Sequence, residues 1–226
     1  MITIEHTEVW GWVAAIRGMR NPMNSWDKSD SFQTKIDRIA DDDDAFIQVD
    51  RTGIGENDLA LMKKLVRAGS DHSKFMRMIH VQFDVTAPLY WWKEFDTYKV
   101  GTVSNSCSTM HKIHEKEFTM DDFSHEHLSK LALADLPFIV KRLNEYRSYF
   151  LRYNDKNEWW NMIQLLPSSY NQKRTIDLNY QVLQNIYFAR RNHKLDEWHA
   201  FCHWIECLPY SKLITLENPN KEINEE

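Results

Sequence analysis

Hydrophobic and polar residues alternate at Val81, Phe83 and Val85, and this period of two predicts a strand buried on one face. Pairing of that strand is expected to end at Pro88, because proline has no backbone N–H to donate. A second strand is predicted over residues 2–9. Beyond these strands the chain is predicted to be mostly helical.

Apolar residues recur with a helical period over most of the remaining chain. Pro137 interrupts the longest such pattern, so two helices joined at this proline are predicted there. Thr119 and Asp122 precede them at the spacing of a capping box. The other helices are expected over Gly11–Met19, from a cap at Asn57 to Gly69, over Tyr90–Phe95, Glu158–Leu166, Thr175–Arg190 and Leu195–Leu208.

A polar run follows the short helix at 90–95, directly after Gly101. Seven of the eight residues from Thr102 to Thr109 carry a hydroxyl, thiol or amide group. The helix before the run has a wide aromatic face, formed by Tyr90, Trp91, Trp92 and Phe95. An aromatic face followed by a loop rich in hydrogen-bonding groups and poor in charges is typical of a ligand site.

Length and composition favour one globular domain. The chain has 226 residues, of which 42% are hydrophobic and 13% aromatic, so residues 1–215 are predicted to form a single domain and residues 216–226 a polar tail. Nine tryptophans are more than one core easily absorbs. They indicate a pocket for a flat ligand or a subunit interface, with plain core packing as the alternative for each ring.

Charge and cysteine usage exclude several classes of protein. A net charge of −5 does not support a broad electrostatic grip on nucleic acid, whereas a mononucleotide needs only a few local cations. The N-terminus lacks the features of a secretory signal, and no apolar run approaches a membrane span. Three sparse cysteines fit reduced thiols. We therefore expect a cytoplasmic protein with no nucleic-acid or membrane partner.

Two groups of residues have some features of metal sites. The acidic stretch Asp41–Asp44 lacks the defined spacing of oxygen ligands that calcium needs, so a solvated surface is the better interpretation. His199 and His203 stand one turn apart with Glu206 on the same side, a spacing that can hold a metal. No glutamate base lies between the histidines, and the helix has an apolar face that they flank. No metal is predicted.

Polar side chains near the C-terminus suggest a different ligand. Asn179, Asn185 and Arg190 lie among aliphatic and aromatic residues, and buried amides need partners that a pyrimidine-like or flavin-like edge would supply. The alternative is a solvated helix face with an ordinary arginine at its C-terminus. Cys107 has no neighbouring cation to stabilise a thiolate, so a free residue in a polar loop is preferred to a nucleophile.

Three separated segments resemble the flavin-dependent thymidylate synthases, and together they cover most of the chain. The residues that carry the resemblance are Ala14–Arg20, similar to the family's early Ala/Arg helix; His72 and Phe83-x-Val85-x-Ala87-Pro88 in the middle; and Leu166-Pro167, Asn179, Asn185 and Arg190 toward the C-terminus.

The resemblance implies an α+β fold, an antiparallel sheet with a helical bundle, and reductive methylation of dUMP to dTMP using methylenetetrahydrofolate, FAD and NADPH. It also implies a homotetramer with sites built across subunits. The FAD contacts that it implies are His72, Lys74, Thr97, Tyr98, Lys99, Asn105, Asn179 and Asn185. The pyrimidine-nucleotide contacts that it implies are Glu94, Ser104, Asn105, Ser106, Cys107, Ser108, Thr109 and Arg190, with Arg190 as the catalytic residue that polarises the uracil ring.

The family's most charged motif is altered here. The family's motif is Arg-His-Arg followed, after seven further residues, by Ser. At the same spacing this chain has Thr97-Tyr98-Lys99 and then Cys107. Glu94 stands where the family has a glutamine, and Thr109 stands where it has an arginine. Each lost charge-assisted contact is worth about 1.5–3 kcal/mol, so nucleotide binding would weaken by orders of magnitude. The charges therefore come from elsewhere, or the ligand has changed. The possible replacements, in a neighbouring subunit, are Arg17, Arg20, Lys173, Arg174 and Arg191.

Two rival functions follow from these losses. One is an altered chemistry on the same scaffold, such as hydroxymethylation of a pyrimidine nucleotide. The other is a non-catalytic descendant that keeps the assembly and a nucleotide-binding or flavin-binding pocket.

Overall fold

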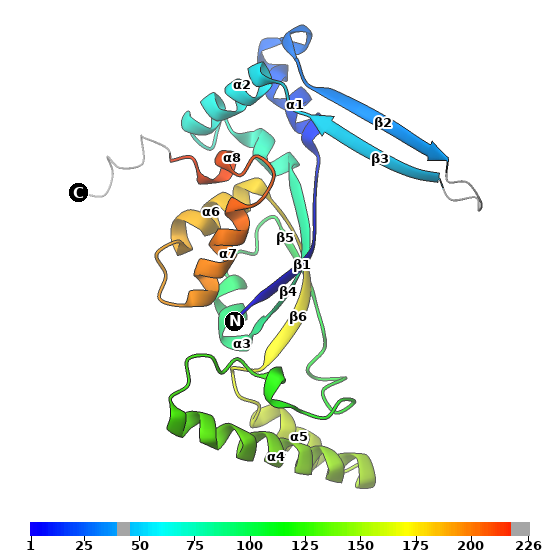
Figure 1. Cartoon of the computed structure of the whole chain (residues 1–226), viewed down its shortest axis with the longest axis vertical. Coiled ribbons are helices and arrows are strands. Elements are labelled where there is room, and N and C mark those ends of the chain that lie inside the picture. The colour runs from blue at the N-terminus through cyan, green and yellow to red at the C-terminus, as the bar shows by residue number, and fades with distance from the viewer. Residues whose placement is uncertain (40–45, 218–226) are drawn as a thin grey trace. The chain divides into compact units, whose positions relative to one another are not determined.

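Four strands form an antiparallel sheet in the order β1–β4–β6–β5 (Figure 1). Their bounds are Thr3–Trp10 for β1, His80–Pro88 for β4, Asn171–Asn179 for β6 and Thr102–Ser106 for β5. The structure, a computed structural model, describes residues 1–39 and 46–217, with the backbone only for residues 34–39 and 46–52. The sheet and its helices confirm the predicted α+β class. The acidic stretch Asp41–Asp44 and residues 218–226 lie outside the described residues.

The chain divides into two compact units, each made of three separate segments. Unit 1 consists of Met1–Thr7, Gln82–Asp177 and Arg191–Cys202, and unit 2 of Glu8–Val81, Leu178–Arg190 and His203–Glu226. Strands β1, β4 and β6 each continue from one unit into the other. The single domain over residues 1–215 stays a prediction. No helix among the described residues is both long and apolar enough to cross a membrane.

Unit 1 has an aromatic core between α3 (Leu89–Phe95) and α7 (Asp196–Glu206). Trp91 of α3 and Trp198 and Phe201 of α7 are fully buried, and the ring centroids of the two tryptophans are 4.8 Å apart. Phe83 and Pro88 behave as predicted, since Phe83 is buried in β4 and Pro88 is both the last residue of that strand and the N-cap of α3. These aromatic residues form core packing, not the wall of an open pocket.

A second cluster in unit 1 joins α4 (Lys130–Tyr153) and α5 (Lys156–Gln164). The prediction of two helices joined at Pro137 is wrong, because α4 passes through this proline without a break. Leu136 and Leu143, on either side of it, are both buried in the same cluster, and their burial holds the two halves in one helix. The buried members of the cluster are Ile113, Phe118, Phe123, Leu136, Leu143 and Met162. The predicted capping box at Thr119 and Asp122 is confirmed in the short helix η4 (Met120–Asp122).

Unit 2 contains the remaining helices and a two-stranded antiparallel sheet. The helices are α1 (Trp12–Arg20), η1 (Asn21–Met23), η2 (Trp26–Lys28), α2 (Glu56–Arg67), η3 (Lys74–Met78), α6 (Tyr180–Arg190) and α8 (Lys212–Thr215), and the strands are β2 (Phe32–Ile39) and β3 (Phe46–Gly53). The predicted cap at Asn57 is wrong, because Gly55 is the N-cap of α2. The carboxylate of Asp30 instead accepts from the backbone N–H of Asn57 (2.9 Å) and of Asp58 (3.0 Å). A distant residue therefore supplies the capping group.

A buried ion pair joins α1 to α2. The Arg20 Nε donates to Asp58 Oδ1 over 2.6 Å, and the two side chains are 5% and 0% exposed. Burial opposes ionisation of Asp58, but hydrogen bonds from Ser29, Ser31 and Arg20 outweigh it and hold the pKa of Asp58 below its ordinary value. Arg20 is consequently unavailable as a phosphate-binding charge.

Candidate functional site

The unit 1 part of the predicted site begins where α3 ends. The Thr97 hydroxyl donates to the carbonyl oxygen of Glu94 over 2.7 Å, which helps to terminate the helix. Tyr98 is half-buried, with its ring packed edge-on against Phe95 and Trp198. Lys99 and Thr97 are exposed. The three residues at the altered motif therefore present one aromatic anchor and one exposed cation.

Glu94 is held by two residues from the far end of unit 1. Trp198 Nε1 donates to Glu94 Oε2 over 2.9 Å, and His193 Nε2 lies 3.3 Å from the same oxygen. Glu94 and His193 are each about a quarter to a third exposed, at 33% and 24%. The carboxylate is therefore paired and accessible. Sequence reasoning missed both partners, because nothing in the local pattern connects residues about a hundred positions apart.

Residues 102–106 of the polar run form a strand, so the prediction of a loop is wrong for these residues, whereas residues 107–109 lie outside the strand. Ser104, Asn105 and Ser106 belong to β5, the exposed edge strand beside β6. The Cys107 N–H donates to the Lys173 carbonyl over 2.9 Å, and Gln172 Nε2 donates to the Cys107 carbonyl over 2.8 Å. Pairing with β6 fixes this backbone, which local composition did not reveal.

The residues just beyond β5 form a small hollow. Cys107 is exposed with a free thiol, Ser108 and Thr109 are half-buried, and the Ser108 hydroxyl accepts from the backbone N–H of His111 (2.9 Å). A cavity of about 160 Å³ there is lined by Cys107, Ser108, Lys112, Ile113, Lys116, Glu117, Phe118, Asp122 and Tyr170.

Two lysines of that hollow were missed by sequence reasoning. Lys112 pairs with Glu115, and Lys116 pairs with Asp122 over 3.0 Å. Tyr170 also lines this hollow. Burial, and to a smaller extent the negative charges of Asp122 and Cys107, raise the pKa of its hydroxyl above the ordinary value. Both lysines lie in the turns between β5 and η4, where no regular period in the sequence signals their positions.

The cations of β6 are already neutralised by carboxylates of unit 1. Arg174 Nη1 donates to Asp96 over 2.7 Å, and its guanidinium lies 4.2 Å from the centre of the Trp92 ring. Lys173 Nζ lies 3.1 Å from Asp84 and 3.2 Å from Glu5. Hydrogen bonds from Thr175 and then Lys173 hold the pKa of Asp84 below its ordinary value. Neither cation is free within unit 1 to bind an anion.

The unit 2 part of the predicted site centres on the start of α6. The prediction of a helix from Thr175 is wrong in its first turn, because residues 175–179 complete β6 and α6 starts at Tyr180. Asn179 is 8% exposed, and its Oδ1 accepts from the Val182 N–H over 3.1 Å. It is therefore the N-cap of α6. The cap uses the oxygen of this amide, not its Nδ2 group.

Two predicted residues, His72 and Lys74, lie at the start of η3, which contacts α6. The hydroxyl of Ser73, between His72 and Lys74, donates to Gln181 Oε1 over 3.4 Å. His72 and Lys74 are both exposed. The contact of Ser73 with Gln181 therefore brings the segment that carries His72 and Lys74 to the first turn of α6.

The remaining predicted residues of unit 2 lie further along α6. Asn185 is exposed, and its Oδ1 accepts from Gln181 Nε2 over 3.4 Å. Arg190 is half-buried in the last turn. Asn179 caps the start of α6 and Arg190 stands in its last turn, so α6 separates the two residues by about 16 Å along its axis. The predicted site residues thus form one group in each unit.

Other candidate sites offer less. Among the described residues, no group of three or more His, Cys, Asp and Glu side chains could hold a metal ion. His199 Nδ1 lies 3.4 Å from Asp196, and Glu206 accepts from the Tyr187 hydroxyl over 2.8 Å.

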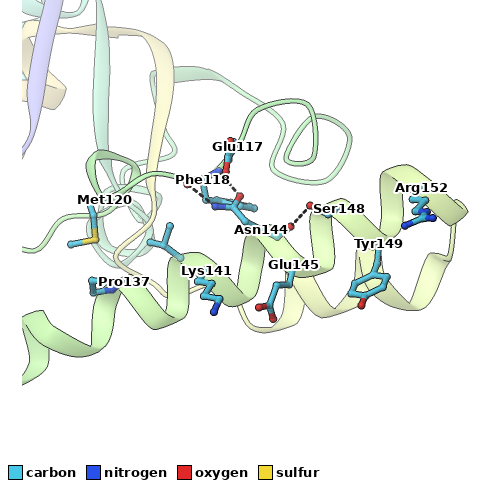
Figure 2. Close-up of a pocket in the computed structure, with 11 residues that line it drawn as sticks. Glu117, Phe118, Met120, Pro137, Lys141, Asn144, Glu145, Ser148, Tyr149 and Arg152 are labelled. Atoms are coloured by element: carbon cyan, nitrogen blue, oxygen red, sulfur yellow. Dashed lines mark hydrogen bonds between the residues drawn. The ribbon is translucent and has the colours of Figure 1, made fainter.

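A cavity of about 700 Å³ beside α4 contains none of the predicted residues (Figure 2). Asn144 there exchanges two hydrogen bonds of 2.8 Å with the backbone of Phe118, and its own carbonyl accepts from Ser148. These contacts fasten a loop to α4.

Comparison with solved structures identifies the fold. Thymidylate Synthase X (ThyX) from Helicobacter pylori, solved with FAD and dUMP, superposes with a TM-score of 0.65 at 14% identity, over 96% of this chain and 98% of that one. This chain has the flavin-dependent thymidylate synthase fold. A second structure of the Helicobacter pylori enzyme with FAD and dUMP gives a TM-score of 0.63 at 16% identity, with coverage of 96% and 97%.

The same fold is found in a UMP/dUMP methylase. The UMP/dUMP methylase PolB from Streptomyces cacaoi, bound to 5-Br dUMP, gives a TM-score of 0.60 at 13% identity, covering 96% of each chain. No protein-family profile matches this chain. No curated protein sequence matches it either. The likeness therefore lies in the fold.

Proposed function

We propose that this chain is a flavin-dependent enzyme that methylates dUMP reductively to dTMP, using methylenetetrahydrofolate, FAD and NADPH. The observation that supports it is the superposition over 96% of the chain on a structure that holds FAD and dUMP. The assembly expected with this function is a homotetramer.

The side chains of unit 2 suit a flavin. Asn179 offers an amide donor that the cap does not use, Asn185 an exposed amide, and His72 and Lys74 supply donors and positive charge for an extended anionic cofactor. We assign the FAD contacts of unit 2 to these four residues, and those of unit 1 to Thr97, Tyr98, Lys99 and Asn105. When bound, FAD supplies the hydride and relays the one-carbon unit.

The protein's own contribution is binding and orientation. Arg190 would polarise the uracil ring, and no protein nucleophile is needed. Hydroxyl, thiol and backbone groups of residues 104–109 would wrap the nucleotide. Lys112 and Lys116 also line the hollow beside Cys107 and Ser108, but each is already paired with a carboxylate, Glu115 and Asp122.

The first test is binding of FAD. The purified protein is expected to become yellow with FAD, and Asn179→Asp to weaken FAD binding about five- to tenfold, the equivalent of about 1–1.4 kcal/mol. Aspartate keeps the capping acceptor for Val182 but cannot donate, so thermal stability should change little. A flavin absorbance titration measures the affinity, with Asn157→Asp on α5 as the matched control. Protein that stays colourless with FAD would contradict every proposal that this chain is a flavoenzyme.

A second candidate function is an altered pyrimidine chemistry at C5, such as hydroxymethylation, on a changed ligand. Glu94 favours it, because a carboxylate fixed by Trp198 and His193 replaces a neutral amide where a nucleotide is proposed to bind. Arg174 and Lys173, which would offset that charge, are engaged by other carboxylates. PolB is described as a UMP/dUMP methylase, so the fold accommodates more than one pyrimidine nucleotide.

The charge of Glu94 makes this candidate testable. Glu94→Gln is expected to tighten binding of dUMP about tenfold while leaving deoxyuridine unchanged, because only dUMP carries a phosphate that the carboxylate repels. The glutamine retains an acceptor for Trp198. Calorimetric titration of both ligands measures the difference, with Asp135→Asn, an exposed carboxylate of α4, as control. Equal changes for the two ligands would show that Glu94 does not face the phosphate.

A further inference from the structure

A cavity of about 260 Å³ lies in unit 2 between α1 and the segment that follows it. Its lining residues are Val13, Ile16, Arg17 and Arg20 from α1, and Trp26, Ser29, Ser31, Phe32 and Gln33. None of them belongs to the site assigned to FAD or to the pyrimidine. Among the described residues, the lining also contains no carboxylate.

Helix α1 presents opposite faces to η3 and to this cavity. Gly11 and Gly18 approach η3 so closely that a Cβ at Gly18 would lie 3.0 Å from Met78 Sδ, and one at Gly11 would overlap the Met78 carbonyl. Val13, Ile16, Arg17 and Arg20, at spacings of three and four residues, line the cavity instead. The cavity therefore lies across α1 from η3, the element that carries Lys74.

The cavity is lined in part by a fixed polar network. Arg20 is 4% exposed and donates to Asp58 (2.6 Å), to the Ser25 carbonyl (3.0 Å) and to the Lys28 carbonyl (2.9 Å). The hydroxyls of Ser29 and Ser31 both donate to Asp58 Oδ2. The charges of Arg20 and Asp58 cancel, so this part of the lining is rigid and nearly neutral.

The apolar walls of the cavity are left uncovered. Trp26 is 51% exposed and Phe32 is 63% exposed, although both are large aromatic residues. A hydrogen bond of 2.8 Å from Trp26 Nε1 to Asn21 Oδ1 restrains the indole despite its exposure. Two exposed aromatic rings at the rim of a cavity, of which Trp26 is restrained by this bond, are suited to contact a third ring.

One positive charge in the cavity is uncompensated. Arg17 is exposed, and its guanidinium has no hydrogen-bond or ion-pair partner in the part of the chain that the structure describes. A guanidinium is a planar fork of donors that matches a carboxylate or phosphate, and it keeps its charge at any working pH. The cavity thus combines an apolar interior with a single anion-binding group.

We propose that this cavity binds a small aromatic anion, with its ring against Trp26, Phe32 and Ile16 and its carboxylate or phosphate on Arg17. The size is appropriate, because a cavity of about 150 Å³ holds benzene and this one leaves room for an anionic substituent. The proposal does not depend on the flavin reaction, since it uses none of the residues assigned to it.

The test compares matched probes on the full chain. Benzoate and phenyl phosphate are expected to bind at least tenfold more tightly than benzyl alcohol, as measured by ligand-observed NMR titration. Arg17→Gln should abolish this preference without affecting benzyl alcohol, and Trp26→Leu should weaken all three probes. Arg67→Gln, an exposed arginine on α2, serves as the control. Both altered side chains are exposed, and circular dichroism checks that the variants fold.

The titrations separate the ways in which the proposal fails. Equal affinity for the anionic and neutral probes, or a preference that persists in Arg17→Gln, would overturn it. If benzoate and phenyl phosphate bind with the same affinity, and both variants lose this binding, the result would support an anion site that recognises the charge and the ring together. Probe binding that falls as protein concentration rises would show that a second copy of the chain fills the cavity, and would also overturn it.

Discussion

Arg190→Ala is expected to abolish growth rescue of a thymidine-requiring strain and to lower kcat/KM for dTMP formation roughly ten- to a hundredfold. The reason is the loss of a charged donor proposed to bind the uracil ring, since a hydrogen bond to a charged group is worth about 1.5–3 kcal/mol. Arg190 stands in the last turn of α6, eleven residues from the capping residue Asn179. Binding of FAD should therefore remain.

The controls for this prediction separate catalysis from folding. Arg67→Ala removes an exposed charge of α2, outside the proposed site, and should leave rescue unchanged. Rescue that survives Arg190→Ala would refute the catalytic assignment. A wild-type protein that binds FAD but never rescues growth would instead favour altered pyrimidine chemistry or a non-catalytic descendant.

Asp58→Asn is expected to destabilise the protein by about 3–5 kcal/mol, the usual cost of leaving one partner of a buried ion pair uncompensated. Arg20 would keep its charge while 5% exposed, with two backbone carbonyls as its remaining partners. Chemical denaturation measures the loss. Glu145→Gln breaks the exposed pair with Arg142, in which the side chains are 65% and 37% exposed, and should cost less than about 1 kcal/mol.

The pH dependence of the free energy of unfolding should also reflect the buried Arg20–Asp58 ion pair. The pKa of Asp58 is lowered in the folded protein, so its stabilising contribution is present above the unfolded value of about 3.9 and is lost as pH falls through the folded value. The wild-type protein should therefore lose stability more steeply than Asp58→Asn below about pH 4. Parallel acid profiles for the two proteins would show that Asp58 is not the group responsible.

Local sequence patterns predicted the helices and strands in which buried residues recur at a regular spacing. The alternation through Phe83 and Val85 identified β4, and Pro88 marked its end, because period and proline chemistry are readable from neighbouring residues. The resemblance to flavin-dependent thymidylate synthases predicted the fold that the structural comparison confirms. The roles assigned to individual residues from that resemblance stay predictions.

Local patterns failed where distant contacts outweighed them. Pro137 was expected to break a helix, but burial of Leu136 and Leu143 in one cluster keeps α4 continuous. The polar run from residue 102 was expected to be a loop, but hydrogen bonds to β6 make residues 102–106 an edge strand. In both cases the deciding interactions come from residues far along the chain.

By itself the sequence determined the positions of most helices and the altered charges at residues 94–109, since these follow from residue type and spacing, whereas the α+β class was implied by the family resemblance. Only the tertiary structure decided which charges remain available. It pairs Glu94 with His193 and Trp198, buries Arg20 against Asp58, and leaves Arg17 unpaired beside a cavity among the described residues. The physical reason is that an ion pair depends on distance in space, which local spacing does not encode.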